Sequence, residues 1–244
     1  MTVHLMQCQP HPQALAVWAT RRRLLSPDGD YGYALHALLT SCFGADAPRS
    51  FRYLGQRQGL LAYSRLDLAA LRDLAALAAP DIAAALGLDS LAARRFPDRW
   101  RVGQRLAFEV RTRPVVRAND GRERDAFLHA LGPQSTEPAD EPDPSDQRVR
   151  SEVYIDWLRK RFSDLGAAEI EDSRVDAFQL TRLLVRPPNA DTGKRGSRTV
   201  NGPDVVFKGH LRITESDRFA ALIQRGIGRH RAFGYGMLLL KPPC

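Results

Sequence analysis

The sequence predicts an α+β protein with two ferredoxin-like (RRM-like) βαββαβ units in tandem, each with an antiparallel sheet. Each half of the chain reads in the order strand, helix, strand, strand, helix, strand, and Gly103 separates the halves. The 244 residues are 43% hydrophobic and 26% charged, which is enough apolar material for packed cores. We therefore expect an N-terminal domain over residues 1–102 and a C-terminal domain over residues 103–244.

In the first half, residues 30–43 are the clearest helix. Their apolar side chains recur at intervals of three and four, Asp28 or Asp30 is placed to cap the N-terminus, and Gly44 is placed to end the helix. The elements expected here are a strand over 3–8, helices over 11–25 and 30–43, a hairpin of strands at 50–55 and 60–66, a helix over 67–86 and a strand over 96–102.

In the second half, alternating apolar and polar residues over 104–116 predict a strand. Residues 132–146 are rich in proline and acidic residues without periodicity, which predicts a solvated loop. Thr214 is placed to cap the last helix. The remaining elements expected are a helix over 149–165, strands over 175–185 and 199–213, a helix over 215–225 and a strand over 233–240.

Several classes of protein are excluded by what the sequence lacks. No apolar run approaches the ~20 residues of a membrane helix, and the N-terminus does not resemble a secretory signal. Cys8, Cys42 and Cys244 form no CxxC pair, which argues against a disulfide framework or a zinc site. The six histidines have no metal-ligand spacing. We expect a cytoplasmic protein with no metal, no cofactor and no membrane partner.

The charge of the chain points to a polyanionic partner. The formal net charge is +8, and all but four of the 36 basic residues are arginine, whose planar guanidinium suits phosphate oxygens. A GC-rich genome, which favours arginine codons, is the alternative source of this bias.

A glycine-rich loop over residues 226–236 reads Gly-Ile-Gly, five residues, then Gly-Tyr-Gly. Glycines let backbone amides approach a partner closely, and successive amides bind anions. A dinucleotide fingerprint fits poorly, because that loop follows a strand and opens a helix. The alternative interpretation is a tight helix-to-strand turn. The candidate anion-binding residues of this loop, which the resemblance described below makes candidates for RNA binding, are Gly226, Gly228, Arg229, Arg231, Gly234 and Gly236.

A basic hairpin is the second candidate binding element. Residues 182–212 contain seven basic and only two acidic residues. Lys194, Arg195 and Arg198 lie at its expected tip, where cations can reach a nucleic-acid backbone or groove. The alternative is a solvated hairpin end.

Tyr33 and His36 are the candidate catalytic pair. They are three residues apart on the helix expected over 30–43, and therefore lie on one face. Histidine exchanges a proton near neutral pH, and a neighbouring tyrosine can bind a phosphate or orient the ring. Taken alone, a histidine on an amphipathic helix is more often structural, so the assignment depends on its context.

Three stretches of the chain carry a resemblance to a known family. They are FKGHLRITESDRFAALIQRGIGRHRAFGYGMLLLKP, DYGYALHALLTSCFG, and QRLAFEVRTRPVVR followed after an insertion by RSEVYIDWLRKRF. Together they resemble the CRISPR-associated repeat-processing endoribonucleases, most closely the CasE (Cse-type) branch of the Cascade system. The resemblance covers most of the chain.

The resemblance implies metal-independent cleavage of CRISPR repeat RNA at the base of a stem-loop. A ribose 2′-hydroxyl would attack the adjacent phosphate and leave a cyclic phosphate and a 5′-hydroxyl. By the same match, His36 would be the acid–base residue and Tyr33 would bind or orient the scissile phosphate. The basic hairpin would enter the RNA stem groove, and Arg148 and Arg150 would hold phosphates.

One catalytic position departs from the family pattern. Some members have a lysine five residues after the histidine, where this chain has Ser41. The arginines that could supply the missing charge are Arg21, Arg22, Arg23, Arg49 and Arg52. A related branch, the Csf-type nucleases of type IV systems, relies on arginines, and in that reading His36 would be a bystander.

The implied partners are the repeat RNA, whose 3′ stem-loop the protein would retain after cleavage, and other subunits of a CRISPR effector complex. Two alternatives remain at this point. One is a non-catalytic subunit that binds the RNA hairpin, and the other is an RRM-like protein for unrelated RNAs.

Overall fold

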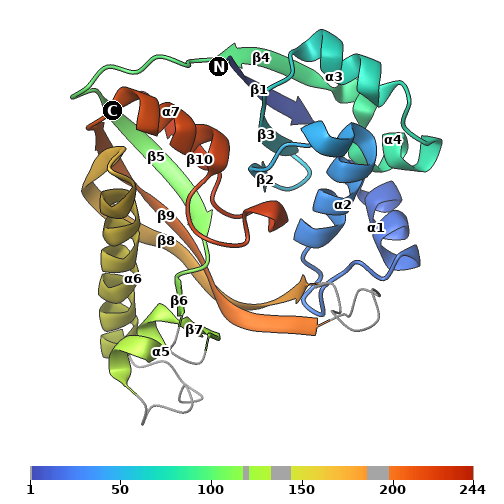
Figure 1. The fold of residues 1–244 in the computed structure, drawn as a ribbon. Coiled ribbons are helices and arrows are strands. Elements are labelled where there is room, and N and C mark those ends of the chain that lie inside the picture. Colours follow the sequence, from blue (N-terminus) through green and yellow to red (C-terminus); the bar gives the residue numbers. More distant parts are fainter. Residues whose placement is uncertain (1, 118–120, 133–143, 186–197, 244) are drawn as a thin grey trace.

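The computed structural model describes residues 2–117, 121–132, 144–185 and 198–243. Two four-stranded antiparallel sheets lie side by side, one from each half of the chain (Figure 1). The helices of each half cover one face of their own sheet. The predicted fold class, two ferredoxin-like units in tandem, is confirmed. Residues 97–104 connect the two sheets, and the division into domains at residue 103 stays a prediction.

The first sheet has the strand order β2-β3-β1-β4, with every neighbouring pair antiparallel, which is the ferredoxin-like arrangement. Apolar side chains of α1, α2, α3 and α4 pack on it around Met6 and Cys8. Its elements are β1 (Val3–Cys8), α1 (Pro12–Arg21), α2 (Gly32–Phe43), β2 (Phe51–Tyr53), β3 (Leu60–Ser64), α3 (Leu68–Ala75), α4 (Pro80–Leu86) and β4 (Ala92–Phe96).

The second sheet repeats this topology in the order β10-β5-β9-β8. A small β6–β7 pair and α5 are inserted between β5 and α6, and a 3-10 turn, η3, follows α7. The elements are β5 (Arg105–Thr112), β6 (Val115–Arg117), β7 (Glu123–Asp125), α5 (Ala126–Leu131), α6 (Pro144–Leu165), β8 (Ala168–Val185), β9 (Arg198–Ile213), α7 (Ser216–Arg225), η3 (Arg231–Phe233) and β10 (Leu238–Lys241).

Several expected elements are wrong in detail. The strand expected over 96–102 is instead β4, which ends at Phe96 and pairs with β1. The helix expected over 67–86 is two helices, because Pro80 starts a new one. The last strand begins at Leu238, since η3 and two left-handed glycines occupy the residues expected to start it.

Two expected helix caps are also wrong. The N-cap of α2 is Tyr31, while Asp30 accepts a hydrogen bond from the backbone of Gly32 (2.7 Å). Asp28 pairs instead with Arg182 of β8 (2.7 Å). Glu215, rather than Thr214, caps α7, because its carboxylate accepts hydrogen bonds from two backbone amides of the first turn.

The two halves are joined by apolar and polar contacts. The hydroxyl of Tyr63 in β3 donates to the carbonyl oxygen of Leu238 in β10 (2.7 Å), and the ring of Trp100 packs edge-on against Phe219 of α7 (5.1 Å). The long β8–β9 ribbon runs toward the start of α2 (Figure 1). Within the described residues, no helix is long and apolar enough to cross a membrane.

Candidate active site

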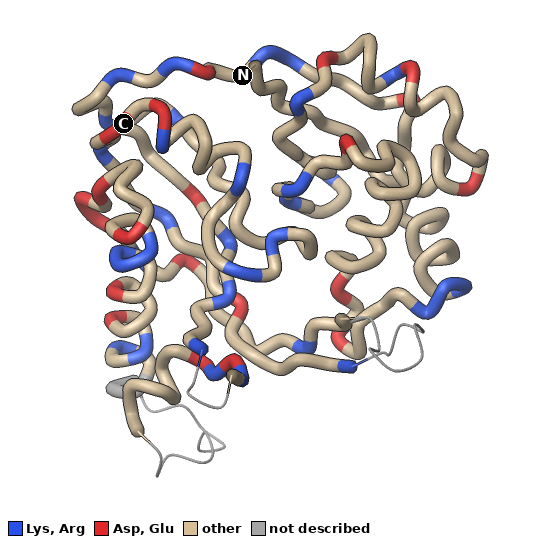
Figure 2. The backbone as a smooth tube through the Cα atoms, viewed as in Figure 1, with Lys and Arg blue, Asp and Glu red and all other residues tan. Residues whose placement is uncertain are grey.

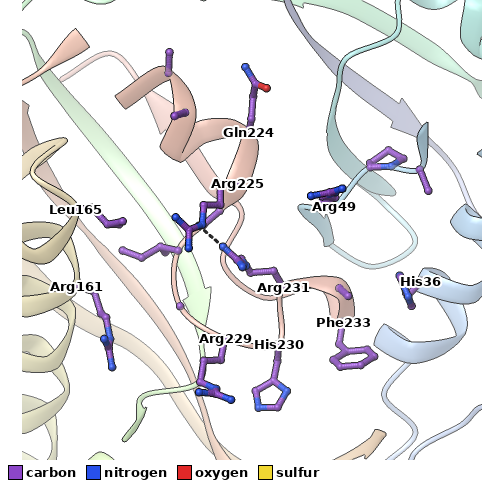
Figure 3. A pocket seen from close by; sticks show the side chains of 18 of the residues that line it. His36, Arg49, Arg161, Leu165, Gln224, Arg225, Arg229, His230, Arg231 and Phe233 are labelled. Atoms are coloured by element: carbon purple, nitrogen blue, oxygen red, sulfur yellow. Dashed lines mark hydrogen bonds between the residues drawn. The ribbon is translucent and has the colours of Figure 1, made fainter. Parts of the chain in front are cut away.

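A cleft of about 1360 Å³ lies between the two halves of the chain (Figure 3). The first half contributes His36 from α2, residues 47–49 before β2, Arg65 and Asp98. The second half contributes Glu123, the end of α6, one side of α7 and the loop over residues 226–233. Neither half forms this cleft alone.

The walls of the cleft are cationic. Lys and Arg positions lie on both sides of the space between the halves (Figure 2). The basic residues that line the cleft are Arg49, Arg65, Arg161, Arg225, Arg229, Arg231, His36 and His230. The acidic residues that line it are Asp98, Glu123, Asp164 and Asp217. The arginines outnumber the carboxylates, so the cleft attracts an anion.

Arg231 is the central cation of the loop. Its guanidinium is half-buried and donates to the carbonyl oxygen of Gly226 (3.4 Å), and among the described residues it pairs with no carboxylate. Burial, together with the nearby charges of Arg225 and Arg49, lowers the pKa of Arg231. Arg49 lies on the opposite wall of the cleft (Figure 3). A bound anion between these guanidiniums would relieve their mutual repulsion.

His36 lies beside an aromatic cluster on the wall of the cleft that α2 forms. Its ring is half-buried and meets the ring of Phe233 edge-on, with centroids 5.9 Å apart. Tyr33 stacks on the same Phe233 ring at 5.5 Å and lies 6.4 Å from the ring of His36. The predicted pair therefore lies on one face of α2, with Phe233 in contact with both rings.

Close backbone packing holds α2 against η3. A side chain at Gly32 would collide with the carbonyl oxygen of Phe233, so only glycine permits this approach. In the loop, Gly226, Gly228, Gly234 and Gly236 all have positive φ. The amide of Ile227 donates to Gly236, and the amide of Gly236 donates to Arg111 (2.8 and 2.7 Å). These two amides serve the turn and are unavailable to an anion.

Glu123 contacts two side chains of the glycine-rich loop. Its carboxylate pairs with the guanidinium of Arg229 and hydrogen-bonds Nε2 of His230 (2.7 Å). The hydrogen bond with His230 and the charge of Arg229 hold the pKa of Glu123 below its usual range. Nothing in the sequence links Glu123 to residues more than a hundred positions away, and sequence analysis did not identify it.

Other predicted residues lie outside the cleft. The side chain of Arg52 is 12% exposed and lies 4.0 Å from Glu109. Burial, together with the charge of Arg111, lowers the pKa of Arg52 to about 10. Arg21 is the last residue of α1, Arg22 and Arg23 follow it, and none of the three lines the cleft.

The RNA-binding candidates of α6 and the hairpin also lie apart from the cleft. Arg150 packs on the ring of Phe127 and lies 3.7 Å from Asp125, with its side chain only 15% exposed. Arg148 is exposed on α6, and Arg198 is exposed at the start of β9. Lys194 and Arg195 lie outside the described residues.

The site combines a proton-transfer group with fixed cations. The imidazole of His36 stands on one wall, that of His230 on the other, and guanidiniums stand on both. This set can move a proton beside an anion and stabilise added negative charge on it. In the part of the chain that the structure describes, no three His, Cys, Asp or Glu side chains gather into a metal-binding group.

Comparison with known proteins gives a family and a fold. The family model described as "CRISPR associated protein" matches residues 3–242. The CRISPR-associated endoribonuclease Cse3 of Thermus thermophilus is 27% identical over 143 residues. That match covers 57% of this chain and 57% of the relative, so the chain spans little more than half the length of this curated protein.

Solved structures match over almost the whole chain. CRISPR endoribonuclease Cse3 bound to a 19-nucleotide RNA has a TM-score of 0.63 at 17% identity, with 99% of this chain and 100% of that chain covered. Cse3 of Thermus thermophilus bound to an RNA that represents a pre-cleavage complex has a TM-score of 0.56 at 19% identity, with the same coverage. These proteins share the fold described above.

Proposed function

The chain belongs to the family of CRISPR-associated proteins, and on that premise we propose that it is an endoribonuclease that cleaves CRISPR repeat RNA at the base of a stem-loop. The single observation that carries the proposal is the cleft, where His36 of one half faces Arg225 and Arg231 of the other (Figure 3). The family relationship supports an RNA substrate, and the cationic walls of the cleft are compatible with its phosphates.

The proposed reaction is an in-line displacement at phosphorus. The 2′-oxygen of the ribose bonds to the adjacent phosphorus as the bond to the 5′-oxygen breaks, which leaves a 2′,3′-cyclic phosphate and a 5′-hydroxyl. The 2′-hydroxyl loses a proton and the 5′-oxygen gains one. His36 carries out proton transfer, a contribution worth about 10²- to 10⁴-fold in rate. Arg231 and Arg49 stabilise the charge on the pentavalent phosphorus, and Tyr33 orients the phosphate. No metal is required in this scheme.

Exposed arginines outside the cleft are candidates for holding the RNA stem. We propose that Arg148 of α6 and Arg198 of β9, which are both exposed, contact its phosphates. We propose that the protein retains the product hairpin within an effector complex of several subunits, as the relatives' association with CRISPR RNA suggests.

The geometry favours this reading over the RRM-like alternative. An RRM binds RNA on the open face of its sheet through exposed aromatic rings. Here the open face of the second sheet is covered by ion pairs between side chains of β5, β8 and β9. These pairs include Lys208–Asp176 (2.7 Å), Arg105–Glu171 (2.7 Å), Arg212–Glu169 (2.9 Å) and His210–Asp172 (2.9 Å).

The test is cleavage of the repeat RNA in excess EDTA, alongside the same RNA with a 2′-deoxyribose at the scissile position. The proposal predicts cleavage of the ribose substrate, a cyclic phosphate on the product and no cleavage of the deoxy substrate. Tight binding of an RNA that stays intact would identify the protein as a non-catalytic hairpin-binding subunit. Cleavage of the deoxy substrate would exclude attack by the 2′-hydroxyl.

A further inference from the structure

Glu123 is connected to the candidate catalytic pair through the glycine-rich loop. It lies on β7, in the small β6–β7 insertion outside the second βαββαβ sheet. Its side chain and that of His230 are 18% and 13% exposed, so their 2.7 Å hydrogen bond is shielded from solvent. Glu123 also neutralises Arg229, which leaves Arg231 as the loop cation without a carboxylate partner among the described residues.

His230 has a backbone conformation that requires support. Its φ is +57°, in the left-handed region, and only one other non-glycine residue in the described part of the chain, Arg23, has a positive φ. Such a conformation is unfavourable for a non-glycine residue and persists where surrounding contacts impose it. The hydrogen bond to Glu123 is such a contact. The carbonyl oxygen of His230 then accepts the amide of Phe233 (2.9 Å), which closes η3.

Phe233 connects His230 to the side chains of α2. Its ring lies 6.1 Å from that of His230, 5.5 Å from that of Tyr33 and 5.9 Å from that of His36. Its carbonyl oxygen also abuts Gly32 at the start of α2. The contacts therefore run without interruption from Glu123 through His230 and Phe233 to the catalytic pair.

We propose that Glu123 is a positioning residue: through His230 and Phe233 it fixes the orientation of Tyr33 and His36, and so sets the rate of RNA cleavage without adding to RNA affinity. This inference rests on the proposed function. Misplacing a catalytic group by 1 Å can cost about a hundredfold in rate. Loss of Glu123 frees the charge of Arg229, so RNA affinity stays the same or increases while cleavage slows.

The test measures single-turnover cleavage of the repeat RNA at saturating protein, with RNA affinity measured in parallel. We expect Glu123→Ala to slow cleavage by about tenfold to a hundredfold. Glu123→Gln retains a hydrogen-bonding side chain of the same shape, and we expect a smaller loss. His230→Gly keeps the left-handed backbone but removes the anchor, and should slow cleavage like Glu123→Ala.

A double-mutant cycle separates positioning from a general loss of stability. If Glu123 acts through the ring of Phe233, Glu123→Ala has little further effect in the Phe233→Leu background. Glu171→Gln is the matched control, because Glu171 also bridges two arginines, Arg105 and Arg212 (2.7 and 3.5 Å), but on the open face of the sheet. We expect this control to cleave at the wild-type rate. An unchanged rate in Glu123→Ala, or losses that multiply in the cycle, would overturn the proposal.

The ring protons of His36 provide a readout that does not depend on cleavage. Their NMR shifts respond to the ring current of Phe233, and we expect them to move in Glu123→Ala and to stay fixed in Glu171→Gln. If the wild-type protein fails to cleave RNA, the proposed function is wrong, but the NMR comparison still tests whether Glu123 fixes the placement of Phe233 beside His36. Unmoved His36 signals in Glu123→Ala would then refute the positioning role.

Discussion

At the scale of residues, the candidate site depends on which arginines remain available to an anion. The sequence placed Tyr33 and His36 on one helical face, because spacing on a helix is a local property. It could not separate Arg49, which lines the cleft, from Arg52, which is buried beside Glu109. That difference arises from a carboxylate 57 positions further along the chain, and no local pattern encodes it.

Substitution of Arg231 tests whether this arginine stabilises the phosphate. Because its guanidinium lies in the cleft without a carboxylate partner among the described residues, we expect Arg231→Gln to slow single-turnover cleavage by about a hundredfold, as removal of a charge-stabilising donor does. Arg159→Gln is the control, since Arg159 lies on α6 with its side chain 52% exposed and paired with Asp156. A wild-type rate for Arg231→Gln would place the phosphate elsewhere.

Long periodic segments were predictable, and the short strands of the insertion were not. β5 and α2 follow from alternation and helical spacing over many residues. β6 and β7 have three residues each, too few to show a period, so the insertion that places Glu123 could not be predicted. The first residues of β8 were missed because its charged side chains pair on the open face of the sheet and mask the alternation.

The β8–β9 ribbon is fixed to the start of α2 by a buried ion-pair network, which makes its stability pH-dependent. Arg111 of β5 donates to Asp204 of β9 (2.7 Å) and to Asp30 beside α2 (3.1 Å). Burial alone would raise the pKa of Asp204, but the hydrogen bond and charge of Arg111 hold that pKa below its usual range. A carboxyl group with a lowered folded-state pKa stabilises the protein above its unfolded-state pKa, and this stabilisation disappears as pH falls through the folded-state value.

We therefore expect Asp204→Asn to reduce the free energy of unfolding at pH 7 by about 3 kcal/mol, because it leaves part of a buried pair uncompensated. The difference from wild type should shrink as the pH falls below about 4, because the carboxyl of the unfolded wild-type chain then takes up a proton, and it should vanish once the pH falls through the lower folded-state pKa. Urea unfolding at several pH values measures both effects. A deficit that stays constant from pH 7 to pH 3 would show that the charge of Asp204 does not contribute.

At the scale of the whole molecule, the cleft exists only because two similar folds are packed together. The order of elements in the sequence predicted the two units, since each is encoded by its own periodicity. The cleft depends on contacts between residues far apart in the chain, such as Tyr63 with Leu238 and Gly32 with Phe233. The resemblance to a known family, rather than any spacing rule, identified His36 as the candidate acid–base residue.

In the proposed mechanism, His36 moves the proton while arginines stabilise the phosphate. The most direct measurement compares wild type and His36→Ala in single-turnover cleavage of the repeat RNA in EDTA, with RNA affinity measured for both. We expect a rate at least ~10²-fold lower for His36→Ala and nearly unchanged affinity. Equal rates for the two proteins would contradict it and assign the chemistry to the arginines alone.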